Sequence, residues 1–289
     1  MRTRRAFLAA VGAAAVVGAG GLVVERDAVH RWYSDLTDPE PAASPPTRTA
    51  GPLRSGSFPS LACGRQVGWQ LAYPPGARPG AALPVALVLH GRGGDEASAF
   101  GELHLDGYLA DVVAGGAAPF ALAAVDGGDH SYWHARRSGE DPQAMLLQEF
   151  LPRLAAMGLR TARVGVLGWS MGGYGALLLA ETVGPARIAA VAADSPALWQ
   201  RAADAAAGAF DDASDFAAHD VFAGRARLAG VPVRIACGTR DPFCPAVRAF
   251  LPGVPDLVGA DLGDGAHTNT FWRRTAPAQL RFLAGALAR

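Results

Sequence analysis

A serine enclosed by glycines lies near the middle of the chain, in the segment 168–172 (Gly-Trp-Ser-Met-Gly). An apolar run of strand length, 164–167, precedes this segment, and residues 174–182 have the composition of a helix. A glycine on each side lets a strand and a helix pass close together, so the serine hydroxyl is held at a sharp turn, clear of the sheet. This context predicts that Ser170 is a nucleophile, although the same pattern also occurs in ordinary glycine-rich loops.

A nucleophilic serine needs a base that takes its proton and an acid that fixes the tautomer of that base. The best candidate for the base is His267, in the glycine-rich loop 263–268 just before the final helix. The sequence has one other histidine after Ser170, His219, which lies in a region expected to form a cap. We therefore predict that His267 accepts the proton of Ser170.

The acid is expected between the serine and the histidine in the chain. Asp241 fits this order and lies in a loop that leaves the carboxyl end of the strand 231–237. A proline follows Asp241, so the residue is also compatible with a simple turn, and Asp194 and Asp264 are then the substitutes. Asp241 is the predicted third member of a serine–histidine–aspartate triad.

Acyl transfer also needs hydrogen-bond donors for the negative charge that develops on the carbonyl oxygen. The segment 90–94 (His-Gly-Arg-Gly-Gly) follows a buried strand, 84–89, and can turn sharply enough to present the Arg92 N–H. The Met171 N–H lies in the first turn of a helix, where N–H groups have no acceptor within the helix. These two backbone groups are the predicted oxyanion donors. A dinucleotide-binding loop is the alternative for the glycines, but the third glycine of that motif is misplaced.

Aromatic and polar side chains gather in the segment 126–134, which follows the strand 120–125 and should leave the sheet at the same edge as Ser170. The residues predicted to contact substrate are His90, Gly91, Tyr132, Trp133, His134 and Trp272. Trp272 has a second interpretation, as a residue that packs the last helix. His130 and His134 have the spacing of metal ligands on a helix, but glycines precede them and no glutamate follows His130, so no metal site is predicted.

Stretches of strand and helix character alternate along the chain, which predicts an α/β fold with one doubly wound, mostly parallel sheet flanked by helices. The expected strands are 66–73, at an edge of the sheet, 84–90, 120–125, 163–167, 187–193, 231–237 and 257–262, and the expected helices are 97–114, 142–157, 174–182 and 277–288. The segment 195–230 predicts either a small cap over the carboxyl end of the sheet or an ordinary crossover with a long loop.

The composition limits the classes of function. The 289 residues are half apolar, with 26 basic and 26 acidic side chains and no basic cluster beyond the N-terminus, so nucleic acid is not an expected partner. The chain contains no lysine, which excludes a Schiff base, a P-loop and a serine–lysine dyad. Cys63, Cys237 and Cys244 are too few for a structural zinc site, and the last two are compatible either with a disulfide or with free thiols.

The N-terminus has the features of an export segment. Arg4 and Arg5 precede Phe-Leu and an uncharged stretch rich in alanine, valine and glycine, a pattern that resembles a twin-arginine signal. Residues 1–34 are therefore predicted to engage the twin-arginine export machinery, with an uncleaved membrane anchor as the alternative. The proline-rich residues 35–56 are predicted to be a linker, and 57–289 a catalytic domain with its cap at about 195–230.

With these motifs in place, the sequence resembles the α/β-hydrolase superfamily over roughly residues 64–287. More narrowly, it is similar to the esterase group that includes S-formylglutathione hydrolase, the feruloyl esterases and the secreted mycolyltransferases. The resemblance implies oxyanion donors at Arg92 and Met171 and an acyl site lined by the segment 131–134. It specifies the class of reaction rather than the substrate.

The sequence as a whole predicts an exported serine hydrolase that cleaves carboxylic esters through an acyl-enzyme, with no metal or organic cofactor. The first alternative is an acyltransferase that uses the same residues on a sugar or lipid hydroxyl of the cell envelope. The second is a cell-envelope binding protein that keeps the fold without turnover, and an intact triad argues against it. Contact with a membrane is expected only through the N-terminal segment.

Overall fold

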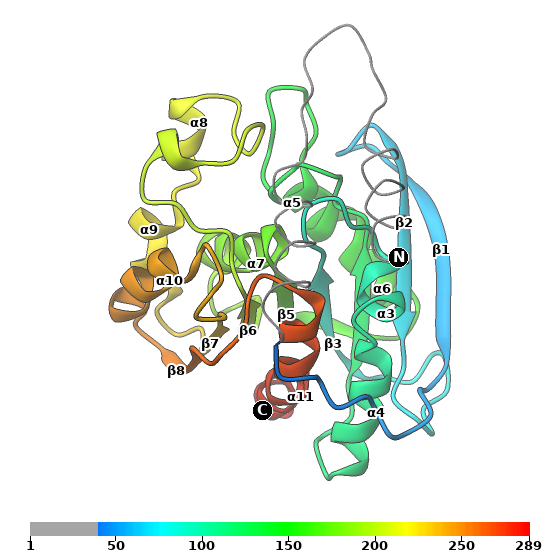
Figure 1. Cartoon of the computed structure of the whole chain (residues 1–289). Helices are drawn as coiled ribbons and strands as arrows, with labels where there is room; N and C mark the ends of the chain where they lie inside the picture. Colours follow the sequence, from blue (N-terminus) through cyan, green and yellow to red (C-terminus); the bar gives the residue numbers. More distant parts are fainter. Residues whose placement is uncertain (1–39) are drawn as a thin grey trace, which may run out of the picture. The chain divides into compact units, whose positions relative to one another are not determined.

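The computed structural model describes residues 40–289, so the predicted export segment at 1–34 lies outside the described residues. Within the described part, eight strands form one sheet in the order β1-β2-β4-β3-β5-β6-β7-β8 (Figure 1). β2 pairs antiparallel with both of its neighbours, and all other neighbouring strands are parallel. The strands are β1 (Leu53–Ser60), β2 (Arg65–Ala72), β3 (Pro84–Leu89), β4 (Ala121–Val125), β5 (Arg160–Trp169), β6 (Ile188–Asp194), β7 (Val233–Ala236) and β8 (Leu257–Asp261).

Helices lie between the strands and cover the sheet. They are α3 (Ser98–Gly101), α4 (Leu105–Ala114), α5 (Pro142–Ala144) with a π-helical turn (Met145–Phe150) leading into α6 (Leu151–Ala156), α7 (Met171–Val183), α8 (Ala213–Ala218), α9 (Val221–Gly224), α10 (Cys244–Phe250) and α11 (Asn269–Leu287). The predicted doubly wound α/β architecture is confirmed by this alternation and by the parallel strand pairs.

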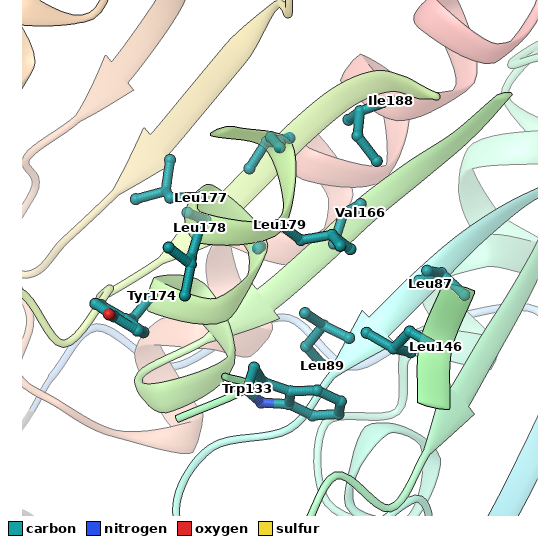
Figure 2. Packing of buried hydrophobic residues seen from close by; sticks show 14 of the residues in the cluster. Leu87, Leu89, Trp133, Leu146, Val166, Tyr174, Leu177, Leu178, Leu179 and Ile188 are labelled. Carbon is teal, nitrogen blue, oxygen red and sulfur yellow. The ribbon is translucent and has the colours of Figure 1, made fainter. Parts of the chain in front are cut away.

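The side chains of β3 show that both faces of the sheet are buried. Val85, Leu87 and Leu89 belong to one apolar cluster, which also contains residues of α7, whereas Ala86 and Val88 belong to a second cluster with residues of α4 and α11. Successive side chains of a strand point to opposite faces, so a strand covered on both sides is a continuous apolar run. Figure 2 shows part of the first cluster, in which Leu87 and Leu89 are labelled together with Tyr174, Leu177, Leu178 and Leu179 of α7.

The folded domain begins earlier than predicted. The strand expected at the edge of the sheet, β2, is covered along its length by β1, from the Leu53–Ala72 pair to the Ser60–Arg65 pair. Only Phe58 and Ser60 of β1 are buried. Because β1 is a largely exposed outer strand rich in serine, its composition resembles that of a linker.

Residues further upstream also pack on the domain. The Asp111 carboxylate of α4 accepts hydrogen bonds from the backbone N–H groups of Thr47 and Arg48, both at 2.9 Å. The Tyr108 hydroxyl donates to the Ser44 carbonyl at 2.8 Å. The stretch 44–56 is therefore bound to α4 and the sheet, and the predicted linker boundary at residue 57 is wrong for this stretch.

Two helices differ from their predicted limits. The helix expected at 97–114 is split into α3 and α4 at His104, whose backbone is left-handed with φ 55°. The last helix begins eight residues before the predicted start at Pro277, because the Thr268 side chain caps it by accepting the Phe271 N–H at 3.2 Å. Pro277 lies inside α11, although proline usually marks the first turn of a helix.

The segment 195–230 carries α8, α9 and two short 3-10 turns (Ala202–Asp204 and Arg225–Leu228), and we call it the cap region. Figure 1 shows α8 projecting from the helices and strands of the body. Cys237 and Cys244 are both buried and free. None of the helices within residues 40–289 is both long and apolar enough to cross a membrane.

Candidate active site

Ser170 lies at the sharp turn between β5 and α7, with a left-handed backbone at φ 54°. A Cβ atom added at Gly168 would overlap the carbonyl of Gly172, and one added at Gly172 would overlap the carbonyl of Leu89. Both glycines are therefore required by the close approach of strand and helix. The strained turn holds the serine at the N-terminus of α7, as the motif predicts.

Two hydrogen bonds connect Ser170, His267 and Asp241. The Oγ atom of Ser170 lies 2.8 Å from Nε2 of His267, and Nδ1 of the same ring lies 2.8 Å from Oδ2 of Asp241. The three side chains follow the strands β5, β7 and β8. Ser170 and His267 are 97 residues apart in the sequence, and Asp241 and His267 are 26 residues apart. They are nearly buried, with exposed fractions of 8% for Ser170, 9% for His267 and 2% for Asp241.

The environment of Asp241 favours its ionised form. Burial by itself raises the pKa of this carboxyl, but the charge and hydrogen bond of His267, the nearby Ser195 side chain and the Phe243 N–H outweigh burial and lower the pKa below its usual range. An ionised carboxylate accepts the Nδ1–H of the imidazole, which leaves Nε2 free to accept the serine proton.

The substitute acids lie elsewhere. The carboxylate of Asp194 accepts a hydrogen bond from Gln279 at 2.6 Å, and the Asp194 carbonyl accepts the Ser170 N–H at 2.9 Å beneath the turn. The side chain of Asp264 is largely exposed and pairs with Arg240 at 3.2 Å. Of the three candidate acids, Asp241 is the one that contacts His267.

Two aromatic rings pack against His267. The ring of Phe243 lies 5.3 Å from the imidazole centroid, and the indole of Trp272 lies 5.0 Å away, nearly perpendicular to it. Trp272 also lies 6.3 Å from Trp169, the residue before the serine, and is 4% exposed. Trp272 therefore packs the start of the last helix against the site and holds the imidazole, which agrees with the second of its two interpretations. Its contact with substrate stays a prediction.

The loop 90–94 passes beside the serine. A Cβ atom on Gly91 would lie 2.9 Å from the indole nitrogen of Trp169 and 3.4 Å from Cβ of Ser170. The loop turns back through a hydrogen bond from the Gly94 N–H to the Gly91 carbonyl at 3.1 Å. The structure thus brings the loop of Arg92 next to the Ser170–Met171 turn, where both predicted oxyanion donors are located.

His90 and Trp133 brace this loop instead of lining a substrate pocket. The Nε2 atom of His90 accepts the Gly127 N–H at 2.9 Å, and Nδ1 lies 2.8 Å from the Gly91 carbonyl, to which it can donate. Burial lowers the pKa of His90, in keeping with a neutral ring that has one donor and one acceptor. The indole of Trp133 donates to the His90 carbonyl at 3.2 Å, is fully buried and belongs to the apolar core (Figure 2).

Tyr132 and His134 point into the cap region. The Tyr132 ring lies 5.3 Å from Trp199 and 6.3 Å from Phe210, while His134 stacks on Phe210 at 5.2 Å. Their exposed fractions are 3% and 1%. These two residues therefore attach the cap region to the loop after β4, and their predicted contact with substrate is not what the structure shows.

Two cavities begin at residues that lie beside the triad, although no triad residue lines either of them. The first, of about 610 Å³, begins at the ring that packs on the imidazole and is lined by Leu198, Trp199, Gln200, Arg201, Asp204, Pro242, Phe243, Pro245 and Ala246. The second, of about 700 Å³, begins at the loop 90–94 and is polar, with Arg65, Gly93, Gly94, Asp95, Asp126, Gly128, Asp129, His130, Ser131, Arg136, Ser138, Glu140, Gly208 and Asp211 in its wall. Sequence reasoning missed Phe243 and Trp199, although each is an isolated aromatic residue in a polar or alanine-rich segment.

Comparison with known proteins decides the family. A family model described as "Putative esterase" matches residues 60–249, about two thirds of the chain. The chain belongs to this esterase family. It is a serine carboxylic ester hydrolase with an α/β-hydrolase fold, and the resemblance inferred from the sequence is confirmed. None of the curated proteins matches the esterase sequence.

Solved structures share the fold of this esterase at low sequence identity. A ferulic acid esterase has a TM-score of 0.71 and 18% identity, over 81% of this chain and 97% of the other. Fluorophosphonate-binding serine hydrolase F of Staphylococcus aureus has a TM-score of 0.67 and 18% identity, over 82% and 99%. An S-formylglutathione hydrolase from Agrobacterium tumefaciens has a TM-score of 0.69 and 16% identity, over 83% and 97%.

Proposed function

We propose that Ser170, His267 and Asp241 are the catalytic triad of this esterase and that the enzyme forms an acyl-enzyme on Ser170. The observation that carries the proposal is the unbroken pair of 2.8 Å hydrogen bonds from the serine hydroxyl through the imidazole to a buried carboxylate. Only the correct imidazole tautomer satisfies both bonds, so the serine hydroxyl is positioned to lose its proton.

In the first half-reaction, Oγ of Ser170 attacks the acyl carbon of the ester while its proton moves to Nε2 of His267. The negative charge on the carbonyl oxygen is held by the N–H groups of Met171 and Arg92, and Asp241 stabilises the imidazolium. The carbon–oxygen bond to the alcohol then breaks, and the alcohol leaves with the proton from Nε2. Water repeats these steps on the acyl-enzyme and releases the carboxylic acid with the serine restored.

The mechanism also places the leaving group. The alcohol oxygen must come within hydrogen-bond reach of Nε2, so the alcohol lies on the side of His267, where the rings of Phe243 and Trp272 flank the imidazole. The cavity that begins at Phe243 and includes Trp199 extends from this side. We therefore assign the alcohol part of the ester to this cavity, whose aromatic wall favours apolar or aromatic alcohols.

We further propose export by the twin-arginine route, on the strength of Arg4, Arg5 and the uncharged stretch after them. This route carries proteins that are already folded, which suits a domain with buried free cysteines. Fractionation of cells that express the full chain or Arg4→Lys/Arg5→Lys tests it. We expect the wild-type protein to be exported and the variant protein to stay in the cytoplasm. An equal distribution of the two proteins would contradict the proposed route.

A serine-directed fluorophosphonate probe tests the triad. The probe should label the wild-type chain on the peptide that contains Ser170, and Ser170→Ala should remain unlabelled at an unchanged melting temperature. Labelling of Ser170→Ala at another serine would exclude the assignment. Absence of labelling in the folded wild type would favour a binding protein without turnover, and acyl transfer to an added alcohol in preference to water would indicate an acyltransferase.

A further inference from the structure

A group of two histidines and one aspartate lies where the cap region meets the loop after β4. His134 belongs to this loop, whereas Asp215 and His219 belong to α8 and its C-terminal end, one helical turn apart. One ligand atom from each of the three side chains lies within 4.8 Å of the other two. Nδ1 of His219 is 2.9 Å from Oδ1 of Asp215, and Nδ1 of His134 is 3.8 Å from the same oxygen.

His134 has more acceptors than protons. Its Nε2 lies 3.0 Å from the Ala209 carbonyl and its Nδ1 lies 3.0 Å from the Ala135 carbonyl, while the side chain is fully buried. A neutral imidazole carries one N–H, so one nitrogen directs a lone pair at a carbonyl oxygen. A metal ion on that nitrogen would replace this contact between a lone pair and a carbonyl oxygen.

The contacts of His134 match those of a metal-binding histidine. Such a ligand usually donates its second ring N–H to a backbone carbonyl, which fixes the ring and directs the other nitrogen to the metal. The bond from Nε2 to the Ala209 carbonyl serves this purpose. It leaves Nδ1, which lies 3.0 Å from the Ala135 carbonyl and 3.8 Å from Asp215, as the nitrogen that a metal would bind. At His219, Nδ1 also contacts the Asp215 backbone carbonyl at 2.9 Å, a bond that a metal on Nδ1 would replace.

We propose that His134, Asp215 and His219 bind one divalent transition-metal ion, for which Zn²⁺ is the best match. Two imidazole nitrogens and a carboxylate oxygen form a common zinc ligand set, with solvent as the fourth ligand. Ligand atoms about 2.0–2.1 Å from a tetrahedral zinc lie about 3.3 Å from one another. The separations of 2.9 and 3.8 Å from the Asp215 oxygen lie on either side of that value. The two imidazoles stack with their centroids 4.3 Å apart and their planes 28° apart, so one ring must turn for both histidines to face the same ion.

The proposed ion has a structural role. It joins α8 to the loop after β4, next to the ion pair of Arg136 with Asp211 at 3.0 Å, which spans the same boundary. The Tyr174 hydroxyl donates to the His219 carbonyl at 2.6 Å and so connects the site to the helix that follows Ser170. No step of ester hydrolysis uses the ion, so this proposal stands or falls independently of the triad.

The test uses the full chain without an affinity tag, freed of metal with EDTA and dialysed. Co²⁺ is added while its visible absorption is recorded, and thermal unfolding is followed with and without Zn²⁺. The wild type should bind one Co²⁺ per chain with tetrahedral absorption bands. Its melting temperature should rise by about 5–10 °C when free Zn²⁺ exceeds the Kd about a hundredfold.

Three variants complete the experiment. His219→Gln and Asp215→Asn should lose the Co²⁺ bands and the thermal shift, and Asp215→Asn keeps an oxygen for the Asp211 N–H that the carboxylate accepts at 2.8 Å. His130→Gln removes a histidine of the same loop whose Nδ1 lies 2.6 Å from Asp129, and should behave as the wild type. Melting of the variants in EDTA within a few degrees of the wild type would show that they fold.

Absence of bands and of a thermal shift in the wild type would overturn the proposal. An equal shift in the wild type, His219→Gln and Asp215→Asn would do the same, because it would place the metal elsewhere. A stability that changes with pH but not with added metal would show that a proton, and not a metal ion, occupies the group.

Discussion

Phe243 binds Asp241 through its backbone and His267 through its ring. The Phe243 N–H donates to Oδ1 of Asp241 at 2.8 Å, and the phenyl ring lies 5.3 Å from the imidazole of His267. The same ring forms the start of the 610 Å³ cavity. One residue therefore orients the acid, packs the base and borders the space assigned to the alcohol.

Phe243→Ala should separate these roles, because it removes the ring and keeps the backbone N–H. We expect kcat/KM for esters of aromatic alcohols to fall about 10-fold relative to methyl esters of the same acid, from loss of apolar contact. Steady-state kinetics on the two ester series measure the ratio. Phe222→Ala is the control, since Phe222 packs on Phe250 and not on the triad. An equal loss on both series would contradict the assignment of the cavity.

Asp241→Asn should lower kcat by roughly 1,000- to 10,000-fold with little change in KM, because an amide can hold the imidazole in the wrong tautomer and cannot stabilise its charge. Asp264→Asn is the matched control, as Asp264 was the other candidate acid in this part of the chain. It should retain activity within about twofold. Similar losses in the two variants would show that Asp241 is not the acid.

Gly91→Ala tests the position of the loop that carries Arg92. A methyl group at Gly91 would press on Trp169 and Ser170, so the loop must move and the Arg92 N–H must shift from the oxyanion. We expect kcat to fall about 10- to 100-fold, somewhat less than the loss of a whole donor. Gly101→Ala is the control, because a Cβ there meets no atom within 4 Å. Wild-type kcat in Gly91→Ala would place the oxyanion donors elsewhere.

Glu181 should make stability depend on pH. Burial raises the pKa of this α7 carboxyl to about 8, although Arg227 at 3.5 Å lowers it in part. The native carboxyl thus keeps a proton that the unfolded chain releases above its usual pKa, so stability falls as pH rises from about 4.5 to 8, by at most about 1.4 kcal/mol per pH unit. Urea unfolding at pH 5, 6 and 7 measures this slope. Glu181→Gln should reduce it, while Asp194, whose pKa burial raises to about 7, keeps part of the slope in the variant. An unchanged slope in the variant would refute the assignment.

Local sequence patterns were sufficient to find the three side chains of the proposed triad, which the structure brings within hydrogen-bond distance. The turn at Ser170 is predictable because the strand and the helix pass so close together that only glycine fits at positions 168 and 172. The two glycines therefore stand at a fixed spacing on either side of the serine. The continuous apolar run of β3 is likewise enough to place a strand that is covered on both faces. Asp241 and His267 follow from the order of strands and loops, because parallel strands end at the same edge of the sheet.

Contacts between distant segments were not predictable in the same way. Trp133 is conspicuous in the sequence, but its burial depends on two glycines that leave room for the indole, Gly127 of the same loop and Gly175 of α7. The pairing of His134 with His219 depends on how the cap region folds back on the loop after β4. The strand β1 could not be recognised from its sequence, because its proline and serine residues are also typical of a linker. It is held in the sheet by pairing with β2, not by a buried apolar face.

The most direct test of the proposed mechanism is hydrolysis of p-nitrophenyl acetate, butyrate and octanoate by the full chain, by Ser170→Ala and by Ser57→Ala. Ser57 lies exposed on β1, so its loss controls for removal of a hydroxyl. We expect Ser57→Ala to equal the wild type and Ser170→Ala to lose at least about 10,000-fold in kcat at an unchanged melting temperature. Equal turnover by the folded wild type and Ser170→Ala would contradict a serine mechanism at Ser170.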